Sequence, residues 1–162
     1  MVARRASLGA TLFGLIFTAS CSGTPTQPSA NVDTCDPALW THVWGPDRLV
    51  MISPCRTATG VVTDMHTNED GDFDIRLAVD PPYADLPNAQ NVAQLNGHLQ
   101  LEAICQAPIL ATDAQQACGS YRGSLVLPSV GQHISATGPY VLDTNHGWTE
   151  LHPLSVIRIL QP

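Results

Sequence analysis

Residues 70–80 of this chain read DGDFDIRLAVD, and the alternation within this stretch decides the fold class. The apolar side chains on one side of an extended chain would be Phe73, Ile75, Leu77 and Val79. The polar side chains on the other side would be Asp72, Asp74 and Arg76. A period of two indicates a β-strand with one buried face, and Asp70-Gly71 just before it is a hairpin signal.

Further segments extend this β pattern along the chain. The other predicted strands are 57–66, 98–105, 133–143 and 148–160. A short helix is expected over 36–44, because Asp36 suits the N-cap and Pro37 the first helical position. The sequence therefore predicts a mainly β domain, a five- to six-stranded antiparallel barrel with a short N-terminal helix.

One glycine-bearing pattern resembles the oligonucleotide/oligosaccharide-binding (OB) barrel. Val130, Gly131, Ile134 and Gly138 follow the form V-G-x-x-I-x-x-x-G, which a late strand of that barrel often carries. The resemblance covers about residues 57–160 and implies a single OB-like domain over 35–162. It implies no activity, because the same fold serves many functions.

The N-terminus has the organisation of an export signal. Arg4 and Arg5 precede an apolar run over 8–19, which is too short to span a bilayer. Thr18-Ala19-Ser20-Cys21 resembles the lipobox of bacterial lipoproteins. The resemblance implies a signal peptide over 1–20 and a lipid on Cys21. The alternative is an ordinary secreted protein in which Cys21 is incidental.

Residues 21–34 are small, polar and proline-bearing, so a flexible tether is expected between Cys21 and the domain. The expected location is the outer face of the cytoplasmic membrane or the cell envelope. The membrane is thus one partner, reached through the lipid anchor.

The charge of the chain argues against nucleic acid as a partner. The sequence contains seven arginines, no lysine and fourteen acidic residues. Removal of residues 1–20 would leave five arginines against fourteen acidic residues, a net charge of −9. Phosphate backbones are held mainly by Lys and Arg, which are scarce here.

Four cysteines remain once Cys21 is set aside, an even number in an oxidising compartment. Three pairings are open. Cys35–Cys55 and Cys105–Cys118 are favoured because each closes a short local loop. Zinc is the alternative for these cysteines, although the chain lacks a C-x-x-C pair.

The segment DTNHGWTELHP, residues 143–153, contains several side chains that can bind a metal or a ligand. It resembles the ending D-x-x-H-G-W-x-E-x-H-P of an uncharacterised family of secreted bacterial proteins, and D-G-D-x-x-I-R-L at 70–77 matches the same family. The resemblance implies a grouping and no activity. Gly147 is expected in a hairpin turn, followed by a strand that places Trp148, Glu150 and His152 on one face.

Three interpretations of this segment stay open. In the first, a divalent metal such as zinc is bound by Asp143, His146, Glu150 and His152. In the second, Trp148 is a stacking platform for a sugar or peptide, with Glu150 and His152 at its rim. In the third, the helix of Trp40 and Trp44 covers this face, and the segment is a structural lock.

The function predicted from these observations is a non-enzymatic binding module of the cell envelope, with a protein or glycan ligand and no cofactor. Its contact residues would be Asp74, Arg76, His98, Trp148 and Glu150. The alternative is a zinc-dependent hydrolase that uses the last hairpin. Sequence motifs for nucleophilic serine catalysis or nucleotide binding do not occur.

Overall fold

A computed structural model describes residues 34–161 of the chain. The predicted signal peptide, Cys21 and nearly all of the tether lie outside the described residues, so those assignments stay predictions. Within the described part, no helix is long and apolar enough to cross a membrane.

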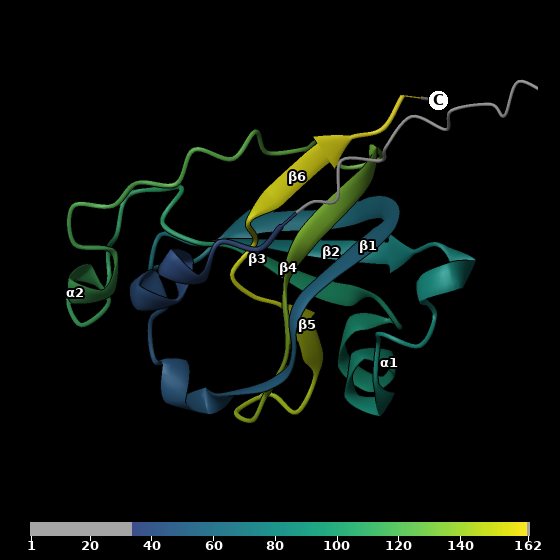
Figure 1. The fold of residues 1–162 in the computed structure, drawn as a ribbon, viewed down its shortest axis with the longest axis horizontal. Coiled ribbons are helices and arrows are strands. Elements are labelled where there is room, and N and C mark those ends of the chain that lie inside the picture. Colours follow the sequence, from purple (N-terminus) through teal and green to yellow (C-terminus); the bar gives the residue numbers. More distant parts are fainter. Residues whose placement is uncertain (1–33, 162) are drawn as a thin grey trace, which may run out of the picture. The chain divides into compact units, whose positions relative to one another are not determined.

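Six strands form one sheet that closes into a ring (Figure 1). The strands are β1 (Leu49–Thr67), β2 (Phe73–Val79), β3 (Leu99–Ala103), β4 (His133–Asp143), β5 (Thr149–Leu151) and β6 (Val156–Ile159). Their order is β1-β2-β3-β5-β4-β6, and an additional pairing of β1 with β4 closes the ring. The mainly β prediction is confirmed.

The prediction of a wholly antiparallel barrel is wrong in one pairing, because β3 and β5 run parallel. The remaining pairings are antiparallel. The ring β1-β2-β3-β5-β4 contains five strands, and strand direction cannot alternate all the way around an odd ring. One parallel neighbour pair is therefore required by closure.

The first strand is longer than predicted. It begins at Leu49 instead of Thr57 and pairs with β4 along most of its length. The register shifts between Met51 and Arg56, around Pro54, which cannot donate a hydrogen bond to the sheet. The tertiary pairing with β4 thus continues the strand through a segment whose sequence does not alternate.

The last predicted strand, 148–160, is divided into β5 and β6. His152 and Pro153 lie between the two, joined by a cis peptide bond. Because Pro153 has no N–H, the ladder stops there. β5 pairs with β3 and β4, whereas β6 pairs with the first half of β4.

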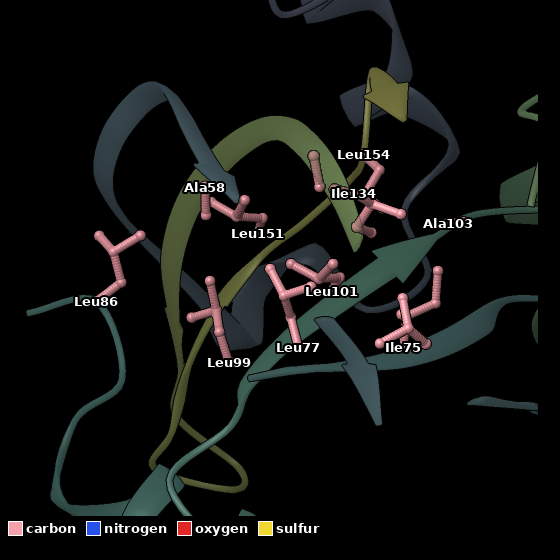
Figure 2. Packing of buried hydrophobic residues seen from close by; sticks show 12 residues of the cluster. Ala58, Ile75, Leu77, Leu86, Leu99, Leu101, Ala103, Ile134, Leu151 and Leu154 are labelled. Carbon is pink, nitrogen blue, oxygen red and sulfur yellow. The ribbon is translucent and has the colours of Figure 1, made fainter. Parts of the chain in front are cut away.

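The interior of the ring is filled by the apolar faces that alternation predicts (Figure 2). Ile75 and Leu77 of β2 meet Leu99 and Leu101 of β3 and Leu151 of β5, and all five are fully buried. Full burial of such a side chain contributes about 1.5–3 kcal/mol, so this interior is the main source of stability.

The helices are short and lie outside the ring. Residues 34–161 contain two α-helices, α1 (Ala89–Leu95) and α2 (Gln115–Cys118), and three 3-10 helices, η1 (Pro37–His42), η2 (Pro46–Arg48) and η3 (Pro81–Tyr83). Asp36 caps η1 by accepting a hydrogen bond from the Ala38 N–H at 2.9 Å, as predicted. The element ends at His42, however, so Trp44 lies beyond it and is 40% exposed.

Two disulfides hold the segments that flank the ring, and their pairing confirms the favoured prediction. Cys35 is bonded to Cys55 and Cys105 to Cys118. The first ties the start of the domain to β1. The second closes the segment that contains α2, which touches η1 through a hydrogen bond between His42 Nδ1 and the Ala117 carbonyl at 3.1 Å.

A matched pair of leucines tests this description of the interior. Leu101→Ala removes a fully buried side chain and should lower the free energy of unfolding by about 2–5 kcal/mol. Leu110 is 72% exposed, so Leu110→Ala should change it by less than about 0.5 kcal/mol. Urea denaturation with the disulfides intact measures both values, and equal values for the two variants would contradict the fold.

Candidate functional site

The parallel seam between β3 and β5 brings polar side chains into one row on the outer face of the ring. Gln100 of β3 lies opposite Arg76 of β2 on one side and Glu150 of β5 on the other. Two residues further along β3, Glu102 lies opposite Asp74 of β2. Because side chains on one face repeat every two residues, His152 continues the row begun by Glu150.

These polar side chains are buried. Burial of Glu150 and His152 was expected only in the third interpretation, and burial of Gln100 and Glu102 was not predicted from the sequence. Glu150, His152 and Gln100 have no exposed surface, and Glu102 and Asp74 are less than a tenth exposed. Strand alternation places them outside the barrel, as expected from Leu151 lying inside it. A second layer of chain therefore covers this part of the outer face.

That second layer comes from two segments of the chain. Val43 and Leu49, with Trp40 beside them, pack against Val141, which is the neighbour of Glu150 on β4. The other cover is the segment after β3, whose Ile104 packs with the Cys105–Cys118 disulfide and Leu39 of η1. This arrangement agrees with the third interpretation, in which the N-terminal segment covers the last hairpin.

A chain of hydrogen bonds links the last hairpin to the buried row. The indole N–H of Trp148 donates to Glu150 Oε2 at 2.9 Å. The other carboxylate oxygen, Oε1, lies 3.0 Å from Nδ1 of His152. Glu102 Oε2 lies 3.6 Å from the same nitrogen, and Glu102 Oε1 accepts from the Gln100 amide at 3.1 Å.

Trp148 is packed by its neighbours as well as hydrogen-bonded. The imidazole of His146 stacks on it with 4.1 Å between ring centroids and 1° between planes. The guanidinium carbon of Arg76 lies 5.4 Å from the Trp148 ring centroid, within cation–π range. With only 9% of its surface exposed, Trp148 is a wall of the site and not an open stacking platform.

Asp143 organises the hairpin turn that carries His146. Its Oδ1 accepts from the Asn145 N–H at 2.7 Å, and its Oδ2 lies 3.1 Å from His146 Nδ1 and 3.0 Å from Arg48 Nε. Gly147 closes the turn with a φ of 81°, which explains the glycine at that position.

Burial shifts the pKa values of the acidic side chains around His152. It raises the pKa of Glu102 to about 8 and that of Asp72 to about 7, and it also raises the pKa of Asp74. Burial alone would lower the pKa of His152, but the carboxylates of Glu102 and Glu150 outweigh it and raise that pKa to about 9. Near neutral pH the imidazole of His152 is therefore a cation among carboxyl groups.

A cleft of about 460 Å³ opens beside this cluster. Two tryptophans, Trp44 and Trp148, contribute to its walls. Its carboxylates are those of Glu69, Asp70, Asp74 and Glu102. Arg48 also reaches the cleft, but its charge is compensated by Asp143.

The structure separates the predicted contact residues. Asp74 and Trp148 line the cleft, and Arg76 and Glu150 lie against Trp148. His98 is not among the residues that line it and instead contacts the Thr63 hydroxyl at 3.0 Å. The observed geometry thus groups four of the five predicted contact residues.

The predicted metal ligands form two pairs. Asp143 contacts His146, and Glu150 contacts His152. Among the described residues, the groups with three potential ligand atoms within 4.8 Å of one another are Asp72-Cys105-Cys118 and Asp72-Glu102-His152. His152 is the one member of the predicted four that belongs to such a group.

Sequence reasoning missed Asp72, Gln100 and Glu102 as members of the site. Alternation alone makes the polar side of strand 98–105 indistinguishable from the solvated face of a half-buried sheet. A signal for Asp72 existed, because it belongs to the D-G-D-x-x-I-R-L motif that accompanies the last hairpin. Its carboxylate accepts a hydrogen bond from the Cys105 N–H at 2.7 Å.

Comparison with known proteins adds nothing to this geometry: no family model matches the chain, and neither a curated protein nor a solved structure is significantly similar to it.

The ionised form of Asp143 should stabilise the fold in a pH-dependent way. Burial opposes its ionisation, but His146, the Asn145 N–H and Arg48 together hold its pKa below the ordinary 3.8. The ionised carboxylate therefore contributes its full stabilisation at pH values above the ordinary pKa of 3.8. This contribution is lost as the pH falls through the lower pKa of the folded state. Asp143→Asn should therefore be less stable than the parent at pH 6.

The same variant should lose stability less steeply than the parent below about pH 4, where Asp143 becomes protonated in the parent. Thermal unfolding followed between pH 2 and pH 7 measures both curves, with the exposed Asp113→Asn as control. Parallel curves for Asp143→Asn and the parent would show that Asp143 carries no such linkage.

Proposed function

We propose that this protein is an exported, lipid-anchored, non-enzymatic binding module of the cell envelope that holds a positively charged ligand group in the cleft beside Trp44. The two disulfides support export, because such bonds persist in oxidising compartments. The lipobox-like sequence that ends at Cys21 supports the anchor, and the tether after it would hold the domain off the membrane.

The composition of the cleft is the observation that carries this proposal. Its carboxylates outnumber its single arginine, and Arg48 is already paired with Asp143. Trp44 lines the cleft with an indole that is 40% exposed, and Glu69 is an exposed carboxylate of the same lining. An aromatic face next to carboxylates suits a cation, through cation–π attraction and charge-assisted hydrogen bonds.

A basic protein segment is favoured over a glycan as the ligand. Trp148 is covered by His146, so Trp44 is the exposed indole of the cleft. The acidic side chains that line the cleft with Trp44 favour a cation over a neutral sugar. An arginine or lysine side chain needs carboxylates and one accessible indole, which Asp70 and Trp44 supply.

The finer assignment of the fold belongs to the same proposal. We interpret the five-stranded ring as an OB-type barrel, supported by its Greek-key order and by the glycine pattern that ends at Gly138. OB barrels commonly bind ligands through surface loops and strand faces, and the cleft lies at such a place. The zinc-hydrolase alternative receives less support, since its predicted ligands form two separate pairs.

Titration with a charged ligand and its neutral isostere tests the proposal. N-acetyl-arginine amide should shift the indole N–H resonances of Trp44 and Trp148 in NMR spectra, and N-acetyl-citrulline amide should not. Trp44→Ala should weaken arginine binding roughly two- to five-fold, which corresponds to about 0.5–1 kcal/mol for an exposed cation–π contact.

Asp70→Asn should weaken arginine binding to a similar degree, and added salt should weaken it in the parent. The exposed Asp113→Asn, which is not among the residues lining the cleft, should leave it unchanged. Equal shifts with the arginine and citrulline compounds would contradict a site for a cation.

A further inference from the structure

We propose that Asp72, Glu102 and His152 form a binding site for one divalent metal ion of the zinc class. One potential ligand atom from each lies within 4.8 Å of the other two. All three residues are buried, and they come from three places in the fold: the turn before β2, strand β3 and the residue after β5. This inference does not rest on the proposed cationic ligand.

Each of the three side chains is oriented by a second partner. Nδ1 of His152 faces Glu150 at 3.0 Å, and one oxygen of Glu102 accepts from the Gln100 amide at 3.1 Å. One oxygen of Asp72 accepts from the backbone N–H of Cys105 at 2.7 Å. Such outer contacts fix the ring and carboxylate orientations of metal ligands in proteins, and each leaves a second donor atom for the ion.

The second ring nitrogen of His152 is an independent indication of a ligand. Nε2 has no hydrogen-bond partner among the described residues, although the ring is completely buried. Buried polar atoms are almost always paired, because an unpaired one costs about 1–3 kcal/mol. A metal ion bound to Nε2, with Nδ1 held by Glu150, would satisfy both nitrogens.

The charge of the surroundings also favours a cation. Carboxyl groups of Asp72, Glu102 and Glu150 gather around the imidazole of His152. In a buried region such an excess of acidic groups is costly unless it is neutralised. A divalent ion would neutralise it with the ligands already present.

The donor set selects the zinc class over calcium. Zinc takes imidazole nitrogen and carboxylate oxygen as ligands, and three protein ligands suffice for it, whereas calcium takes six to eight oxygen ligands. Glu102 also lines the cleft, so an ion can reach the triad from solvent through the cleft.

The first experiment uses the full chain with both disulfides formed and residual metal removed by chelator. Calorimetric titration with Zn²⁺ alone should give one ion per chain and raise the unfolding temperature. Co²⁺ should give visible absorption bands of a four- or five-coordinate site that Zn²⁺ then abolishes. A thiol assay must show no thiol beyond that of Cys21, because reduced Cys105 and Cys118 would bind zinc themselves beside Asp72.

Matched variants then locate the ion. Asp72→Asn and Glu102→Gln keep the shape of the side chain and should each weaken Zn²⁺ binding at least ten-fold. His146→Asn removes the exposed histidine of the hairpin and should leave Zn²⁺ binding unchanged. The Nε2 resonance of His152 in the intact parent should shift on Zn²⁺ addition, which tests the site without any substitution.

Three results would overturn the proposal. The first is the absence of stoichiometric Zn²⁺ uptake by the disulfide-bonded parent. The second is uptake that survives both Asp72→Asn and Glu102→Gln in folded variants. The third is uptake that disappears in His146→Asn, since this would place the ion at the hairpin with Asp143 instead.

Discussion

The buried contact between Glu150 and His152 is the interaction on which the outer layer of this protein depends. Both side chains have no exposed surface and lie 3.0 Å apart on the outside of a closed barrel. Removing one partner of a buried pair typically costs about 3–5 kcal/mol, because the other group stays buried with its compensation lost or reduced. The N-terminal segment, the hairpin with Trp148 and the segment after β3 are all placed so that this pair stays enclosed.

The pair lies beside β3 because the ring has five strands. An odd ring requires one parallel seam, and the seam falls between β3 and β5. Parallel pairing aligns the polar side of β3 with that of β5, so that Gln100 meets Glu150 and Glu102 comes close to His152. The number of strands thus requires the parallel seam, and the seam brings the acidic side chains of β3 beside β5. The cleft lined by Trp44 and Trp148 opens beside this acidic cluster.

Much of the fold follows from local sequence, but the site does not. Alternation in 72–80 and 133–143 predicts β2 and β4, and loop length predicts both disulfides. The ends of β1 and the break at Pro153 depend on pairing partners far along the chain. Burial of Glu102 depends on a covering segment that alternation cannot reveal, because a polar strand face looks the same whether water or another layer of chain lies above it.

The most direct test of this account is a double-mutant cycle on the buried pair. The free energy of unfolding would be measured in urea at pH 7 for the parent, Glu150→Gln, His152→Gln and the double variant. Each single variant should be destabilised by about 3–5 kcal/mol, and the coupling energy should exceed about 1 kcal/mol. Additive effects, with a coupling near zero, would contradict the claim that this contact organises the outer layer.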